Sequence, residues 1–280
     1  MHHIDTESGA SNGLLTQRDS DDKERRGGWD DGEFGDTGRL AVELYLPAGV
    51  KTSPLFMERL RQAMHRALSD GGASVRSSLL YPYGDRERSL FGQLREVGRD
   101  LRLRGGWLDG SLGGNRLVAA IDDKRRAFGR VAGARMVIVG HSAGGIAAVH
   151  AARLIQARDG GKPPLVVMIG SPRCRIPEPL RDSVLYVYAA KAPVSDTKWM
   201  SVRLSDPITR LGSFGGWQAG RWRLPRWRMD KHAPTHASGL RIIGGHADYF
   251  RDQPPFVNAL GLSNLTLTAD VVLRWVRERL

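Results

Sequence analysis

Residues 136 to 150 constrain the fold most, because an apolar run, the pentapeptide Gly-His-Ser-Ala-Gly and a small-residue run follow one another without a break. Residues 136–139 have the composition of a buried strand, and the glycines and alanines after the pentapeptide favour a helix that packs closely on a sheet. Ser142 lies at the apex between them, flanked by Gly140 and Gly144. Glycine is needed at such an apex because strand and helix approach too closely for a β-carbon. The alternative is an ordinary glycine-rich turn, but the context favours a strained turn that lifts Ser142 above the sheet.

Strand-like apolar runs alternate with helical periodicity along the rest of the chain. The expected strands are residues 39–46, 75–81, 164–170, 183–189 and 240–243. The expected helices are 53–70, 88–103, one that begins at Asn115, and 268–280. This alternation predicts an α/β fold, a mainly parallel sheet with helices on both faces. The chain of 280 residues suits one such domain.

Charge divides the chain into two parts. Residues 1–38 carry a net charge of −6 with few apolar residues, which predicts a disordered acidic tail, and residues 39–280 carry +18. Arginine accounts for most of the bases and is scattered along every segment, which favours a solvated surface over a nucleic-acid face, although contact with an anionic membrane surface stays open.

Targeting signals, membrane spans and metal motifs are absent from the sequence. The first residues lack a basic stretch followed by an apolar run, and no window reaches the roughly 20 apolar residues of a membrane span. A soluble, cytoplasmic protein is therefore expected. The single cysteine, Cys174, excludes an internal disulfide or a thiolate cluster. With no phosphate-binding glycine motif either, no cofactor or metal is predicted.

A serine hydroxyl is a poor nucleophile at neutral pH, so Ser142 requires a histidine as base and usually a carboxylate that orients the histidine. Three histidines follow the helix after Ser142, namely His232, His236 and His246. His246 alone directly follows an apolar run and two glycines, which places it on a short loop beyond a strand end. We therefore predict His246 as the base.

The acid is predicted to be Asp196, because it follows the carboxyl end of the expected strand 183–189, where such sheets carry their active sites. The other open candidates are Glu178, Asp206 and Asp230. A serine-histidine pair without any acid is a further possibility. An oxyanion hole requires two backbone N–H groups, one of which belongs to Ala143, the residue after the nucleophile. The second is expected from Ala48 or Gly49, with Val50 left open, because Pro47 has no N–H group.

The pentapeptide 140–144, with its strand and helix, resembles the nucleophile elbow of the α/β-hydrolase superfamily. Residues 169–173, Ile-Gly-Ser-Pro-Arg, resemble a Gly-x-Pro-Arg strand end of the fungal-type, class 3 lipases. Residues 246–250, His-Ala-Asp-Tyr-Phe, resemble the segment around their catalytic histidine. The resemblance covers about residues 130–250, and it implies a lipase- or esterase-like hydrolase with Ser142 as nucleophile and His246 as base.

This sequence departs from those lipases at the acid. They carry an Asp shortly before a Val-Pro or similar pair, whereas residues 191–196 here read Lys-Ala-Pro-Val-Ser-Asp. The three readings left open are a serine hydrolase of acyl or lipid esters, an acyltransferase or thioesterase with the same triad, and an inactive hydrolase fold that serves as a binding or scaffold protein.

Tryptophan and arginine interleave just before His246, in the segment Trp217 to Arg228. Tryptophan anchors proteins at interfaces and arginine pairs with phosphates, so this segment is typical of a surface that docks on anionic lipid or of a lid over an acyl pocket. It lies within a possible lid or insertion at about residues 197–238. Base stacking on nucleic acid uses the same residue types but is disfavoured by the position of the segment beside the active-site loop. The alternative is an insertion that packs its tryptophans on the domain.

Overall fold

A computed structural model describes residues 39–84, 87–103, 105–129, 131–190, 206–219 and 224–280. The predicted acidic tail at residues 1–38 lies outside these ranges. Six strands form one parallel sheet in the order β2-β1-β3-β4-β5-β8. Their bounds are β1 Ala41–Pro47, β2 Ser74–Leu80, β3 Arg135–His141, β4 Leu165–Ile169, β5 Val184–Ala189 and β8 His236–Leu240. The prediction of a mainly parallel sheet is confirmed.

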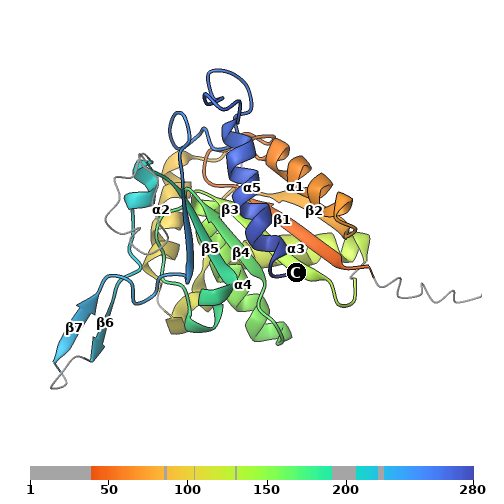
Figure 1. Ribbon diagram of the computed structural model, residues 1–280. Coiled ribbons are helices and arrows are strands. Elements are labelled where there is room, and N and C mark those ends of the chain that lie inside the picture. The colour runs from red at the N-terminus through yellow and green to blue at the C-terminus, as the bar shows by residue number, and fades with distance from the viewer. Residues whose placement is uncertain (1–38, 85–86, 104, 130, 191–205, 220–223) are drawn as a thin grey trace, which may run out of the picture. The chain divides into compact units, whose positions relative to one another are not determined.

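Helices cover both faces of this sheet (Figure 1). The α-helices are α1 Glu58–Asp70, α2 Leu90–Arg102, α3 Leu112–Phe128, α4 Ala143–Asp159 and α5 Asn264–Arg277, and the 3-10 helices are η1 Gly105–Gly110, η2 Glu178–Ser183 and η4 Pro207–Arg210. Along β3, Val137 and Val139 join the apolar core with α1 and α5, whereas Met136 and Ile138 join the core with α3 and α4. Such two-sided burial explains why the strands read as continuous apolar runs. The architecture is that of an α/β-hydrolase fold, with the sharp turn between β3 and α4.

Several element boundaries differ from the sequence predictions. Helix α1 begins at Glu58, five residues after the predicted start, and α3 begins at Leu112, three residues before the predicted Asn115. Strand β8 ends at Leu240, where the apolar run 240–243 was expected to begin, because the strand is a partly exposed edge with the polar sequence His-Ala-Ser-Gly-Leu. Helix α5 begins four residues before the predicted Thr268, since the side chain of Ser263 accepts a hydrogen bond from the Thr266 N–H and caps it.

A two-stranded antiparallel ribbon of β6 (Gly216–Ala219) and β7 (Pro225–Arg228) projects from the domain (Figure 1). Beyond β7, the carbonyl of His232 accepts from the Ile176 N–H, and the N–H of Thr235 donates to Arg181 in η2, just before β5 begins. The ribbon therefore leaves the domain at the amino ends of the parallel strands. Residues 197–205 and 220–223 of the expected lid lie outside the described ranges.

The described helices include none that is long and apolar enough to cross a membrane.

Candidate active site

Ser142 occupies the sharp turn between β3 and α4 in a backbone conformation that side chains rarely adopt, with φ 55° and ψ −132°. In the described part of the chain, only Ser142 and Lys51 combine a side chain with positive φ. A β-carbon on Gly140 would lie 2.5 Å from the backbone of Gly144, and one on Gly144 would lie 2.1 Å from the Pro47 carbonyl oxygen. The predicted strained turn is therefore present, and the glycines permit its close contacts.

The loop after β1 lies directly against Ser142. A β-carbon on Gly49 would lie 2.7 Å from Cβ and 3.1 Å from Oγ of Ser142. Two residues later, the backbone N–H of Lys51 donates to Oε1 of the fully buried Gln93 in α2, at 2.8 Å. Backbone strain at Lys51 is thus held by this partly buried hydrogen bond, which fixes the loop beside the nucleophile candidate.

The backbone donors around Ser142 differ in availability. Ala143 is the first residue of α4, and the N–H groups of a first helical turn have no partner within the helix. The N–H of Ala48 donates to the Leu80 carbonyl at 2.9 Å as the β1–β2 pairing continues, so the expectation of Ala48 as an oxyanion donor is corrected. Gly49 is the member of the predicted pair whose backbone lies against Ser142.

The imidazole of His246 forms a hydrogen bond with the carboxylate of Asp206. Nδ1 of His246 lies 2.9 Å from Oδ2 of Asp206, which is completely buried, while the side chain of His246 is 26% exposed. Oδ1 of Asp206 accepts from the N–H of Ile208 at 2.9 Å, so the carboxylate also caps η4. The preferred acid of the sequence analysis, Asp196, lies outside the described residues, and Asp206 was one of the open alternatives.

Tyr249 completes the surroundings of this carboxylate, and sequence reasoning gave it no role. Its hydroxyl donates to Oδ2 of Asp206 at 3.1 Å and accepts from the Ala189 N–H at 2.8 Å, at the carboxyl end of β5. Burial raises the pKa of Tyr249 well above its usual range, which keeps the donating proton in place. The tyrosine therefore ties Asp206 to the sheet. The signal for it was the spacing His-x-x-Tyr after His246.

His141, the residue before Ser142, links the turn to His246. The two imidazole rings stack with centroids 4.7 Å apart, and Nε2 of His141 lies 3.1 Å from the His246 carbonyl oxygen. Burial lowers the pKa of His141 to about 3, so its ring is neutral and Nε2 carries the proton that it donates.

The described residues show no hydrogen bond between Ser142 Oγ and the His246 ring. In unliganded enzymes, hydrogen bonds between a serine and its base are often long and tighten only in the complex with substrate. The stacked His141 nevertheless brings the ring of His246 to the turn that carries Ser142. The structure thus brings Ser142, His246 and Asp206 to the same edge of the sheet, where β3, β5 and β8 end.

A cavity of about 480 Å³, lined by both polar and apolar side chains, adjoins this edge. Phe56 and Phe250 line it and also pack on His141, with ring centroids 5.1 and 5.2 Å from the imidazole. The remaining lining residues are Ser53, Leu55, Arg59, Ala247, Arg251, Asp252, Gln253, Pro254 and Phe256. Ala247 directly follows His246, so the cavity begins beside the predicted base. Among the described residues no group of three His, Cys, Asp or Glu side chains is arranged to hold a metal ion.

No family model and no curated protein matches this chain. Among solved structures, the chain is similar to SOBER1 of Arabidopsis thaliana, with 12% identity over 86% of this chain and 99% of that one and a TM-score of 0.41. It is also similar to the RedJ thioesterase of the prodiginine biosynthetic pathway in Streptomyces coelicolor, with 15% identity over 88% of this chain and 93% of that one and a TM-score of 0.43. At these values neither structure carries an argument about activity, and the strand order of this chain shows its fold by itself.

Proposed function

We propose that this protein is a serine hydrolase of carboxylic esters, with Ser142 as nucleophile, His246 as base and Asp206 as the orienting acid. The observation that carries the proposal is the hydrogen bond between the fully buried Asp206 carboxylate and Nδ1 of His246, at the edge where the strained Ser142 turn lies. The chain order Ser, Asp, His is also the order of the triad in hydrolases with a nucleophile elbow.

In this mechanism Nε2 of His246 accepts the proton of Ser142 Oγ while the oxygen attacks the ester carbonyl carbon. The negative charge of the tetrahedral intermediate develops beside the N–H of Ala143, at the positive end of α4, and beside the backbone at Gly49. His246 then protonates the leaving alcohol, and an acyl-enzyme on Ser142 forms. Water, deprotonated by the same histidine, attacks the acyl group and releases the acid.

Asp206 orients the base in this scheme. By accepting a hydrogen bond from the Nδ1–H group, it holds His246 in the tautomer whose Nε2 is free to accept from serine, and it stabilises the imidazolium that forms. Its Oδ1 also accepts from the Ile208 N–H and its Oδ2 from the Tyr249 hydroxyl, so the carboxylate has little freedom to rotate. The only support for the alternative of an inactive scaffold was that the sequence carries no acid at the position usual in the class 3 lipases. A buried Asp206 bonded to His246 weakens that alternative.

The phenylalanine rings that line the cavity beside His246 support an ester with an apolar portion. His246 protonates the leaving group, so the part of the substrate that meets Ala247 and the phenylalanine rings is on the leaving-group side. The resemblance of residues 169–173 and 246–250 to the class 3 lipases supports lipid or acyl esters as the substrate class. The cavity and the resemblance both favour ester hydrolysis over the alternative of an inactive scaffold protein.

A fluorophosphonate probe tests the proposal, because it phosphonylates only serines that a neighbouring base activates. We expect labelling of the wild-type protein and none of Ser142→Ala. Ser111→Ala is the matched control, since Ser111 is buried and contacts a histidine, His150, but caps a helix. Probe labelling that persists in Ser142→Ala, or wild-type protein that resists the probe and hydrolyses no p-nitrophenyl ester, would reject the proposal.

A further inference from the structure

The β6–β7 ribbon carries a pair of tryptophans that are largely exposed. Trp217 and Trp227 lie opposite each other in the antiparallel register, with ring centroids 5.4 Å apart in an edge-to-face arrangement. Their side chains are 60% and 42% exposed, and all four residues of β7 are exposed. Large exposed indoles on a projecting element are a frequent sign of an interaction surface.

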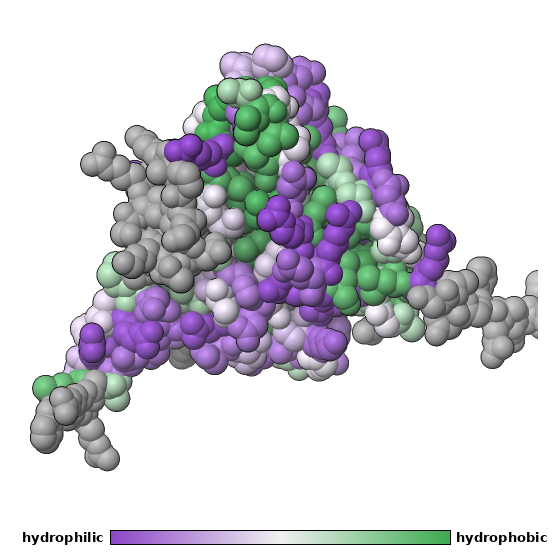
Figure 2. All heavy atoms as spheres, viewed as in Figure 1, coloured by the Kyte–Doolittle hydropathy of each residue, from purple (hydrophilic) through white to green (hydrophobic). Residues whose placement is uncertain are grey.

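Two local contacts fix the positions of these indole rings on the ribbon. A β-carbon on Gly215 would lie 2.4 Å from Cζ2 of Trp227, so this glycine lets the indole lie across the base of the ribbon. Lys231 donates from Nζ to the carbonyl of Trp217, which ties the end of the ribbon to β6. Leu224 and Met229, 67% and 60% exposed, continue the apolar surface at either end of β7. Figure 2 shows hydrophobic residues near the far end of the ribbon, separated from the main body by hydrophilic ones.

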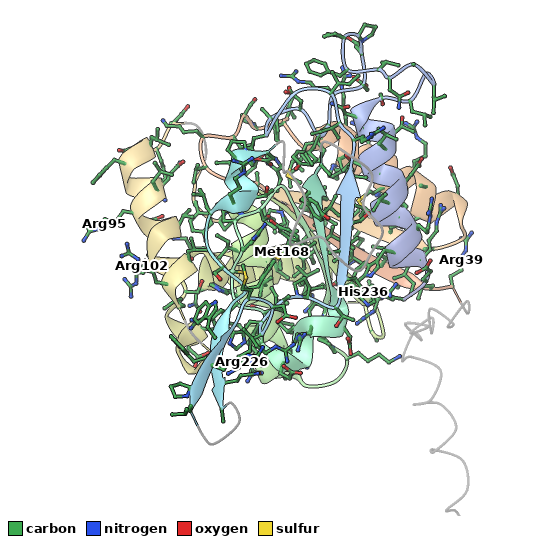
Figure 3. The ribbon with its side chains drawn as sticks, turned by 60° about the vertical axis from the view of Figure 1, so that its left-hand side comes forward. Arg39, Arg95, Arg102, Met168, Arg226 and His236 are labelled. Carbon is green, nitrogen blue, oxygen red and sulfur yellow. The ribbon has the colours of Figure 1, made fainter. Side chains whose placement is uncertain are left out.

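The segment that contains the ribbon, residues 207–229, carries only positive charge. From Pro207 to Met229 the sequence contains five arginines and no acidic residue. Arg226 is exposed on β7 and extends from the ribbon in Figure 3, while Arg228 pairs with Asp230 at 3.2 Å at the end of the strand. Arginine binds phosphate groups with two parallel hydrogen bonds, and tryptophan prefers the region between headgroups and acyl chains.

We propose that the ribbon, defined as Gly216–Ala219 and Leu224–Met229, docks on the surface of an anionic lipid bilayer. The two indoles enter the headgroup region, where their apolar faces leave water, and Arg226 binds lipid phosphates. The ribbon leaves the domain at the amino ends of the strands, whereas Ser142, His246 and Asp206 lie at the carboxyl ends. The ribbon is therefore proposed as an anchor remote from the site rather than as a lid over it.

Vesicle co-sedimentation tests this surface without using the enzymatic reaction. The full chain is mixed with vesicles of phosphatidylcholine, with or without phosphatidylglycerol, at low and high salt. We expect binding only to the anionic vesicles, weakened by salt because surface charges are screened. The double variant Trp217→Ala/Trp227→Ala and the single variant Arg226→Glu should each lose about tenfold or more in vesicle affinity.

Phe91→Ala is the matched control, since Phe91 is 79% exposed on α2 and belongs to another surface. It should bind vesicles as the wild type does. The Arg226→Glu variant keeps the Trp217–Trp227 pair, so the ribbon should still form. A loss of vesicle binding in this variant would therefore come from the changed charge.

Three results would overturn the inference. They are equal binding to neutral vesicles, undiminished binding by both ribbon variants, and tight binding of a single-stranded oligonucleotide in place of vesicles, which would identify the ribbon as a nucleic-acid surface. Vesicle binding by Ser142→Ala separates this inference from the proposed function, because an anchor needs no active nucleophile.

Discussion

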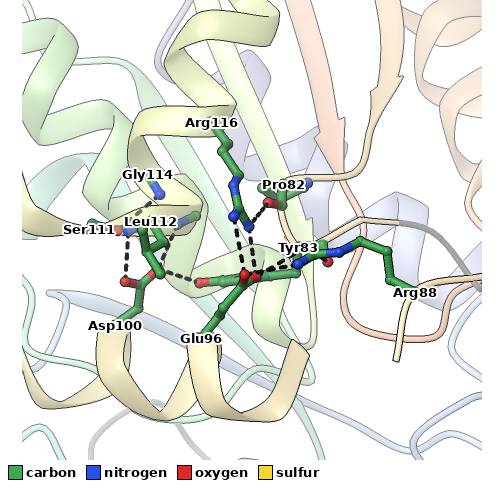
Figure 4. A network of polar contacts seen from close by, with 10 residues as sticks. Pro82, Tyr83, Arg88, Glu96, Asp100, Ser111, Leu112, Gly114 and Arg116 are labelled. Atoms are coloured by element: carbon green, nitrogen blue, oxygen red, sulfur yellow. Dashed lines mark hydrogen bonds and ion pairs between the residues drawn. The ribbon is translucent and has the colours of Figure 1, made fainter. Parts of the chain in front are cut away.

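Two polar clusters in this domain contain the same four residue types, Asp, His, Ser and Tyr. One is the candidate site around Asp206, and the other lies between α2, α3 and α4, around Asp100 (Figure 4). In the second cluster Asp100 accepts hydrogen bonds from the Tyr83 hydroxyl at 2.9 Å and from the backbone N–H groups of Leu112 and Gly113 at 2.9 and 2.7 Å. We call this second set the helix-cap cluster, because its carboxylate satisfies the first turn of α3.

The serine and the histidine differ most between the two clusters. Ser111 accepts from the Gly114 N–H at 2.9 Å as the N-cap of α3, and its hydroxyl contacts Nδ1 of His150, also at 2.9 Å. His150 is 1% exposed, and burial lowers its pKa to about 4. Ser142, by contrast, makes no cap hydrogen bond with its side chain.

His246 in the candidate site keeps about a quarter of its side chain exposed. The comparison teaches that residue types alone do not define an active site. A serine must keep its hydroxyl uncommitted, and a histidine must keep one nitrogen accessible to a substrate.

The largest expected effect separates the two aspartates. Asp206→Asn should lower ester turnover by about 10⁴-fold while the fold persists, because the amide holds His246 in the wrong tautomer. Asp100→Asn should leave turnover per folded molecule nearly unchanged and lower the free energy of unfolding by about 1–3 kcal/mol, through weakened hydrogen bonds to buried donors. Steady-state kinetics and urea denaturation measure the two effects.

Asp196→Asn is the control for this assignment and should behave like the wild type. A greater loss of turnover in Asp196→Asn than in Asp206→Asn would move the acid to the position that the sequence favoured.

Two glycines give the next contrast. Gly49→Ala places a methyl group against Ser142, so we expect turnover to fall by about 10²–10³-fold through displacement of the oxyanion loop. Gly113→Ala meets the ring of Tyr83, at 2.4 Å from Cζ, and should instead lower the melting temperature. Kinetics on a short soluble ester and thermal melting distinguish them. Wild-type turnover in Gly49→Ala would show that the loop has no part in catalysis.

The tyrosines should differ by a smaller factor. Tyr249→Phe removes a donor to Asp206 and should lower kcat about tenfold with little change in KM, as expected for a residue that positions the acid. Tyr83→Phe removes the equivalent donor to Asp100 and should reduce stability only. The pH profile of kcat adds a second readout, because a purely structural tyrosine would not shift its acidic limb. An unchanged kcat and pH profile in Tyr249→Phe would refute the positioning role.

Acid should destabilise the fold through its buried histidines. The folded-state pKa values of His141 and His150 are about 3 and about 4, below the unfolded value of about 6.5, so the unfolded chain takes up protons first as the pH falls. Their stability contribution is complete above the unfolded pKa and is lost as the pH falls toward the folded values. We expect each to cost about 1–2 kcal/mol between about pH 7 and about pH 5.

Urea denaturation at the two pH values measures this loss, and His150→Gln should flatten the dependence because it removes one of the two groups. A loss of equal size in His150→Gln would place the acid sensitivity elsewhere.

The sequence by itself determined the features that neighbouring residues encode. The apolar run and the small residues around Ser142 predicted the strained turn, and the alternation of strands and helices predicted the parallel sheet with helices on both faces, because hydrophobic periodicity and glycine geometry act over a few residues. The roles of Ser142 and His246 stay predictions, since the geometry supports them and only chemistry can test them.

Only the tertiary structure decided which distant groups meet. Asp206 lies far along the chain from the end of β5, so proximity to a strand end favoured Asp196 instead, although the pair Asp206-Pro207 carries the local sign of a capped turn. The hydrogen bond that occupies the Ala48 N–H depends on the pairing of β1 with β2, and the position of the β6–β7 ribbon depends on contacts with residues before β5. These contacts join segments that no local pattern relates, because burial and hydrogen bonding are satisfied only once the whole sheet has formed.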